Sequence, residues 1–101
     1  MVDNSITKLN ISIKRLTQLP DDIGKYTNLQ ILDCRDNKLT SLDNLPPSLQ
    51  ELNCDCNYIS NLDNLPNNLQ ELDCGNNPLK YDFEPTLKNI RNYNAARKLS
   101  S

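Results

Sequence analysis

Histidine is absent from this chain of 101 residues, and glycine occurs only twice. Without histidine, the commonest general base and a frequent metal ligand are missing. The sequence also contains no glycine-rich phosphate-binding loop and no nucleophile with a credible base beside it. We therefore expect no catalytic residue, no bound metal and no cofactor, and we predict that the chain is not an enzyme.

Long apolar runs and a strong charge imbalance are missing as well. No apolar stretch approaches the roughly 18 residues of a membrane-spanning helix, and the opening residues MVDNSITKLNIS lack the basic and apolar segments of a secretion signal. The formal net charge is -2 with 24% charged residues, unlike an acidic disordered tail or a strongly basic nucleic-acid binder. These absences predict a single cytoplasmic domain, residues 1–101, with neither a membrane nor a nucleic acid as partner.

What the chain does contain is a repeated segment of about 20 residues. In the two best units the matching positions are Leu29 and Leu49, Leu32 and Leu52, Cys34 and Cys54, Asn37 and Asn57, and Leu39 and Ile59. A further unit starts at Leu69, and a looser unit of 23 residues starts at Leu9, with Lys14 at the asparagine position. The repeats therefore fill residues 9–79 with about four units.

The motif L-x-x-L-x-C-x-x-N-x-L in these units is similar to the leucine-rich repeat consensus, with cysteine where leucine is more common. The spelling NLPxxLQELxC resembles repeats in proteins of giant DNA viruses of amoebae, and the 20-residue period resembles that of enterobacterial effector repeats. The family resemblance covers roughly residues 6–79. A viral source would place the protein in the cytoplasm of the host.

Alternation within each motif predicts a short strand. Leu32 and Cys34 are two residues apart and face one side, so Asp33 faces the other. Such short strands bury their apolar side only when units stack in parallel, about 4.8 Å apart. Asn37 follows the strand, where its amide can bond the backbone of neighbouring coils and form an asparagine ladder. Because Lys14 replaces asparagine in the first unit, that turn is expected to close differently.

Together with the resemblance, this pattern predicts an α/β solenoid: a short right-handed leucine-rich repeat with a parallel β-sheet on its concave face. Prolines such as Pro46 and Pro66 predict extended or polyproline-like convex segments in the two 20-residue units. In the first unit, a helical turn starting at Asp21 or Asp22 is expected to bury Ile23 and Tyr26.

The two ends of the solenoid need caps. Residues 1–8 form the expected N-terminal cap, in which Val2 and Ile6 would cover the first coil. Residues 80–101 form the C-terminal cap, with Phe83 plugging the last layer and a helix over residues 85–99. The apolar face of this helix is predicted to consist of Leu87, Ile90, Tyr93 and Leu99. Its basic residues are interpreted as a solvated face and not as a nucleic-acid site; they are Lys88, Arg91, Arg97 and Lys98.

The four cysteines are interpreted mainly as structural residues. Cys34, Cys54 and Cys74 occupy the inward strand position and should stack as small buried apolar groups. A metal site or redox switch is the alternative, but a straight column of thiols does not supply the tetrahedron that zinc requires. Cys56 aligns with Asp36 at a polar position, so it is the thiol expected to react most readily, without an assigned function.

The outward strand positions form the candidate protein-binding surface, called here the concave face. Its residues are Ile31, Asp33, Arg35, Glu51, Asn53, Asp55, Glu71 and Asp73. Like charges side by side, such as Glu51 and Glu71, slightly disfavour the fold, and a basic partner would offset that repulsion. In the alternative interpretation the carboxylates only keep the sheet soluble, and Arg35 pairs with Asp55.

The resemblance implies a non-catalytic protein–protein interaction module, with a protein partner for which the carboxylates favour basic character. The outward positions supply about a dozen side chains, fewer than the 20 to 30 residues of a standard interface. We therefore expect a monomer or weak homodimer that binds weakly or uses flanking loops. The alternatives are a self-associating structural protein, or the repeat part of an effector that lacks its catalytic domain.

Overall fold

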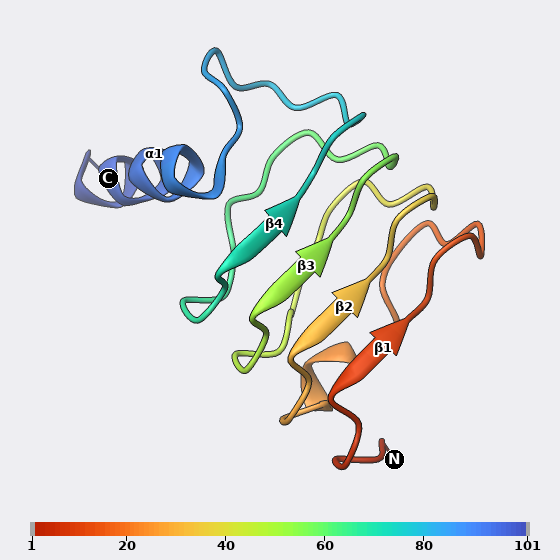
Figure 1. Cartoon of the computed structure of the whole chain (residues 1–101). Coiled ribbons are helices and arrows are strands. Elements are labelled where there is room, and N and C mark those ends of the chain that lie inside the picture. Colours follow the sequence, from red (N-terminus) through yellow and green to blue (C-terminus); the bar gives the residue numbers. More distant parts are fainter. Residues whose placement is uncertain (1, 101) are drawn as a thin grey trace.

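The computed structural model of the chain describes residues 2–100 and contains one sheet of four parallel strands followed by a helix (Figure 1). The elements are β1 (Lys8–Asn10), the 3₁₀ helix η1 (Ile23–Lys25), β2 (Ile31–Asp33), β3 (Glu51–Asn53), β4 (Glu71–Asp73) and α1 (Leu87–Ser100). The strands lie in chain order, β1-β2-β3-β4, so each coil adds one strand to the sheet. The chain is a small α/β solenoid, as the repeats predict.

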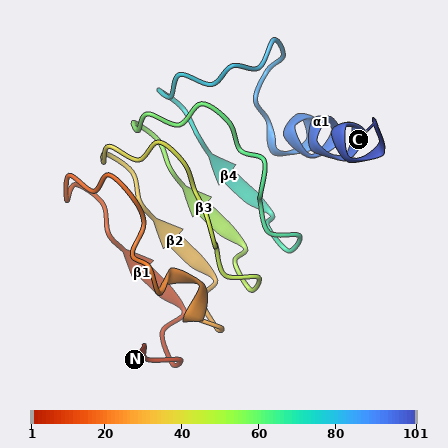
Figure 2. The same ribbon diagram turned by 180° about the vertical axis from the view of Figure 1, so that it is seen from behind.

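Strand register follows the repeat offsets. Lys8 lies opposite Ile31, Ile31 opposite Glu51, and Glu51 opposite Glu71. The return segments run behind the sheet and are best seen from the back of the molecule (Figure 2). In the two 20-residue coils the described return segments contain no helix; each has a tight turn, closed in the first of them by the Leu49 N–H donating to the Pro46 carbonyl at 3.1 Å.

The first coil differs because its return segment is longer. Here η1 supplies the expected helical turn, with Ile23 fully buried and Tyr26 partly buried against the core. Gly24 lies in this turn, and a Cβ added to it would lie 2.8 Å from the backbone oxygen of Asn44. Glycine is therefore required where the first two return segments touch.

The core is a column of apolar side chains between the sheet and the return segments. Leu32, Cys34, Leu52 and Cys54 are buried, and so is Cys74, at 8% exposure. This confirms that the three strand cysteines replace leucine inside the core.

The asparagine ladder joins each coil to the one before it. The Asn57 side-chain nitrogen donates to the carbonyls of Cys54 and Cys34, both at 3.1 Å, and its oxygen accepts from the Leu39 N–H at 3.0 Å. Asn37 does the same for the first coil, where its oxygen accepts from the Lys14 N–H at 3.1 Å. The first turn is thus closed by the asparagine of the following coil and needs none of its own.

The C-terminal helix starts at Leu87, two residues later than predicted, because Thr86 caps it: the Asn89 N–H donates to the Thr86 hydroxyl at 3.1 Å. Within the helix, the Ile90 side chain is fully buried, whereas Leu99 is 91% exposed. The predicted apolar face is therefore wrong at Leu99. The reason is geometric, since the C-terminal part of α1 extends beyond the last coil (Figure 1).

Polar contacts hold the remainder of the cap. The Arg91 guanidinium donates to the carbonyls of Leu69 at 2.6 Å and Pro66 at 3.1 Å, and Arg97 pairs with Asp63 at 2.8 Å. Two of the four basic residues of the helix thus bind the last return segment. Phe83 packs against the core and stacks on Tyr81, as expected of a plug.

At the N-terminal end, Ile6 packs against the core and Val2 is partly buried.

Candidate functional site

The outward positions of β2, β3 and β4 enclose a shallow hollow of about 210 Å³, called here the concave hollow. Its lining residues are Ile31, Leu32, Asp33, Glu51, Leu52, Asn53, Glu71 and Asp73. Six of these eight were predicted to belong to the binding surface. The remaining two, Leu32 and Leu52, are buried leucines at its floor.

Parallel pairing decides which side chains lie together in the concave hollow. Register places Glu51 beside both Ile31 and Glu71, and Asn53 beside both Asp33 and Asp73. Neighbouring strands are about 4.8 Å apart, so side chains in one column are close enough to contact the same ligand group. Four carboxylates and no lysine or arginine line the hollow, which gives it a negative potential.

Arg35 and Asp55 lie outside this hollow. The Arg35 Nε is 3.5 Å from the Asp33 carboxylate, on its own coil. Asp55 instead accepts a hydrogen bond from the Gly75 N–H at 2.6 Å. The predicted Arg35–Asp55 ion pair is therefore wrong. Gly75 has no side chain, so the Asp55 carboxylate reaches the backbone of the next coil, while Arg35 lies against Asp33.

The middle column of the concave face is partly fixed by local bonds. Asp33 accepts from the Arg35 N–H at 3.3 Å, and Asn53 accepts from the Asp55 N–H at 3.1 Å. Such bonds two residues along the chain orient the side chain without removing its second acceptor position. Among residues 2–100, Asp73 lacks the equivalent bond because Gly75 donates to Asp55. Its carboxylate is exposed and keeps its full acceptor capacity.

Comparison with family models matches residues 27–67 to "Leucine Rich repeats (2 copies)" and residues 68–90 to "Leucine Rich Repeat". Together these matches cover more than half of the chain. The chain belongs to the leucine-rich repeat family. Leucine-rich repeat domains generally mediate protein–protein interaction and are typically not catalytic. Comparisons with curated proteins and with solved structures gave no match.

Three of the four cysteines of the leucine-rich repeats, Cys34, Cys54 and Cys74, are core residues. Burial raises the pKa of the Cys34 thiol to about 12, and burial is also the main cause that raises the pKa values of Cys54 and Cys74. These thiols therefore stay protonated at neutral pH and are poor nucleophiles. Within residues 2–100, no group of three or more histidine, cysteine, aspartate or glutamate side chains is placed to hold a metal ion.

Cys56 lies in the turn that follows β3 and is partly exposed. Its φ is 58°, in the left-handed region, and the equivalent residues Asp36 and Asn76 have φ values of 56° and 54°. Aspartate and asparagine tolerate this conformation better than most residues. The alignment of Cys56 with polar residues thus reflects a backbone requirement of the leucine-rich repeat turn.

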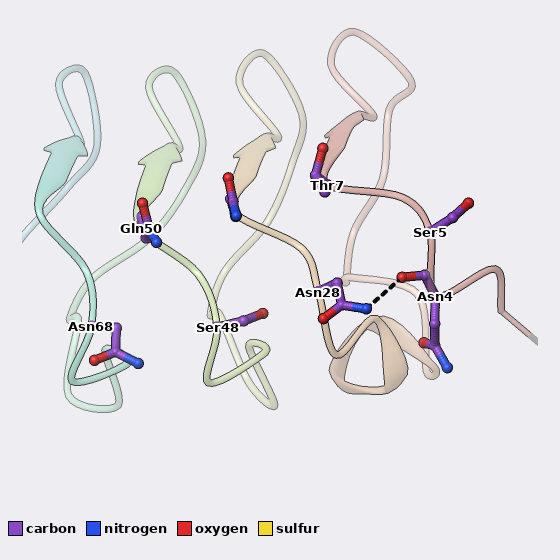
Figure 3. A pocket seen from close by; sticks show the side chains of 8 residues that line it. Asn4, Ser5, Thr7, Asn28, Ser48, Gln50 and Asn68 are labelled. Carbon is purple, nitrogen blue, oxygen red and sulfur yellow. Dashed lines mark hydrogen bonds between the residues drawn. The ribbon is translucent and has the colours of Figure 1, made fainter.

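A second hollow, of about 430 Å³, was missed by the sequence analysis (Figure 3). It lies where the chain enters the strands, and all its lining side chains are uncharged: Asn4, Ser5, Thr7, Asn28, Gln30, Ser48, Gln50 and Asn68. Three of them occupy one repeat position, and each bonds the preceding coil. Asn28 donates to the Asn4 carbonyl at 2.7 Å, Ser48 to Leu29 at 2.6 Å and Asn68 to Pro47 at 3.2 Å.

This second hollow is therefore lined in part by a polar ladder that ties the leucine-rich repeat coils together. The sequence pattern that indicates this ladder is a polar residue two positions before each repeat glutamine: Asn28, Ser48 and Asn68 precede Gln30, Gln50 and Gln70. Separately, none of the helices in the described part of the chain is long and apolar enough to cross a membrane.

Proposed function

We propose that this leucine-rich repeat domain is a non-catalytic binding module whose concave face binds a positively charged segment of a partner protein. The observation that carries the proposal is the concave hollow, where four carboxylates converge without a basic residue in the lining. Complementary charge across an interface steers the encounter and fixes the register of the partner.

Repulsion within the concave hollow adds to this argument. Glu51 lies directly beside Glu71, and like charges at paired strand positions destabilise a sheet. A lysine or arginine of a partner placed between them would relieve that repulsion. Exposed ion pairs contribute only about 0.2–1 kcal/mol each, so binding through this surface is expected to be weak and to weaken further in salt.

The test compares two variants that remove the same number of negative charges. The face variant carries Asp33→Asn, Glu51→Gln, Glu71→Gln and Asp73→Asn. The control variant carries Asp21→Asn, Asp22→Asn, Asp43→Asn and Asp82→Asn, all outside the concave hollow. The wild type and both variants are immobilised and exposed to a cell lysate. The proteins that each of them retains are identified by mass spectrometry.

We expect the wild type and the control variant to retain the same proteins, and the face variant to lose them. Raising the salt concentration from 50 to 500 mM should release the same proteins from the wild type. Equal retention by all three baits would exclude the concave face as the binding surface. Sedimentation of each bait over a wide concentration range shows whether self-association contributes.

A further inference from the structure

The outer edge of β4 carries backbone groups that every other strand of the sheet uses for pairing. On β3 and its turn, the N–H groups of Cys54 and Cys56 donate to carbonyls of the next coil at 2.8 and 2.9 Å. One coil later, the equivalent donors are the N–H groups of Cys74 and Asn76, and the equivalent acceptor is the Gln70 carbonyl. Within residues 2–100 none of these three groups has a hydrogen-bond partner.

A hollow of about 390 Å³ lies along this edge, between the last coil and the segment that leads into α1. It is lined by Asp55, Leu72, Asp73, Cys74, Gly75, Glu84, Pro85 and Thr86. Leu72 is only partly buried, whereas the equivalent leucines of β2 and β3 are buried. The edge hollow therefore combines an apolar floor with three carboxylates and contains no basic side chain.

The C-terminal cap leaves this edge open. Most of its bonds are made behind the sheet: Arg91 to the Leu69 carbonyl, Asn94 to the Leu62 carbonyl, and the Tyr81 hydroxyl accepting from the Leu62 N–H. At the edge the cap is bonded through the Cys74 thiol, which donates to the Pro85 carbonyl at 3.5 Å and leaves the Cys74 N–H free. α1 lies beyond β4, in the direction in which a fifth coil would add (Figure 1). α1 occupies space that a complete fifth coil would need, whereas the edge hollow between β4 and residues 84–86 is open.

We propose that the edge of β4 binds an extended peptide segment with alternating basic residues, which adds a fifth strand to the sheet. Main-chain bonds to Gln70, Cys74 and Asn76 would supply affinity, as in other cases of strand addition. Successive side chains of the added strand would point to opposite sides of the sheet. On the concave face, lysine or arginine would lie beside Glu71 and Asp73, and on the core side a small apolar residue would fit. This surface goes beyond the proposed function, because it uses backbone groups that the concave hollow does not contain.

The probe is a peptide of sequence Lys-Val-Lys-Val-Lys with blocked ends. Its matched control has the same sequence with methyl groups on alternate backbone nitrogens, which removes strand hydrogen bonds and keeps the charge. Binding is followed by NMR, through amide shifts and through hydrogen exchange of the Cys74 and Asn76 N–H groups. At about 90% occupancy, exchange of a newly bonded amide should slow by about tenfold.

We expect the unmodified peptide to slow exchange at Cys74 and Asn76, and the methylated peptide to bind at least several times more weakly. Two protein variants separate the two surfaces. Glu84→Gln, at the edge hollow alone, should weaken binding by about 2- to 5-fold, as expected for one exposed ion pair. Asp33→Asn, at the concave hollow alone, should leave it unchanged.

Four results would overturn the proposal. The first is binding that the methylated peptide reproduces, and the second is no binding at millimolar peptide. The third is protection of Cys74 and Asn76 that rises with protein concentration in the absence of peptide, which would make a second copy of the chain the occupant. Shifts confined to Ile31 and Asn53 would overturn the edge site and support the concave face, so the two proposals fail separately.

Discussion

The inner and outer coils share the leucine positions of the repeat motif but place them in different environments. Leu32 and Leu52, on the inner strands, are buried, whereas Leu9 and Leu72, on the outer strands, are only partly buried. An inner coil has a neighbour on both sides and an outer coil has one, because a solenoid buries its core only between coils. The same residue type at the same repeat position therefore contributes different amounts to stability.

The largest effect should come from the leucine positions. Leu52→Ala removes a buried side chain with a coil on each side and should lower the free energy of unfolding by about 3–4 kcal/mol. Leu72→Ala removes a partly exposed one and should cost about 1–2 kcal/mol. Urea unfolding followed by circular dichroism gives both values. Equal losses would contradict the difference between inner and outer coils.

The asparagine ladder should show the same difference. Asn57→Ala leaves the buried Leu39 N–H without its partner and removes one of the two donors to the Cys54 carbonyl, and should cost about 2–3 kcal/mol. Asn77 is more exposed, so water can replace some of its bonds, and Asn77→Ala should cost about 1 kcal/mol. The same unfolding experiment compares them. A smaller loss at Asn57 than at Asn77 would show that the ladder is not stabilised by its burial.

High pH should destabilise the inner coils through their thiols. Burial raises the pKa of Cys34 to about 12 from 9.0. Below pH 9 the folded and unfolded thiols are both protonated, so this stability is fully present. Above that pH the unfolded thiol ionises first, and the free energy of unfolding should fall by about 1.4 kcal/mol per pH unit for each buried thiol.

The measurement is urea unfolding between pH 8 and 11. Cys34→Ala should reduce the slope of stability against pH. Cys56→Ala, which removes a thiol outside the core column, is the control variant. Tyr81, whose pKa is also raised by burial, contributes in the same direction to all three proteins and cancels in the comparison. Identical slopes in the three proteins would mean that the core thiols do not titrate with unfolding.

The smallest effect concerns a residue that breaks the turn pattern in the first coil. Ile13 has a φ of 56° and is 72% exposed, at the position where the later coils have Asp36, Cys56 and Asn76. A β-branched residue in the left-handed region is strained by about 1–2 kcal/mol. Ile13→Asn should therefore raise the free energy of unfolding by about 1 kcal/mol, and Asp36→Ile should lower it. Calorimetry of the two variants tests the sign.

The strands, their register and the buried cysteines could be predicted because they depend on the repeat period alone. Leu32, Leu52 and Leu72 are equivalent by translation, so one correct alignment places them all. The caps could not be predicted to the residue, since they occur once each. Burial at Ile90 and exposure at Leu99 depend on where α1 leaves the last coil, which periodicity does not contain.

The candidate site was predictable to the same extent. Alternation placed six side chains in the concave hollow, but it could not show that Asp55 bonds the Gly75 backbone while Arg35 turns to Asp33. The contact of Asp55 depends on Gly75 of the neighbouring coil, which has no side chain to block it. The open edge of β4 also required the path of residues 80–86, where the sequence has no repeat to extrapolate.

The asparagine ladder bears on the order in which the coils can fold. Asn37 accepts from the N–H groups of Lys14 and Leu16, and Asn77 accepts from those of Asn57 and Ile59, so each asparagine completes a turn made about twenty residues earlier. During synthesis from the N-terminus, a coil remains unfinished until the following one has left the ribosome. We therefore expect folding of this protein to trail translation by one repeat, and removal of the last coil to undo part of the closure of the one before it.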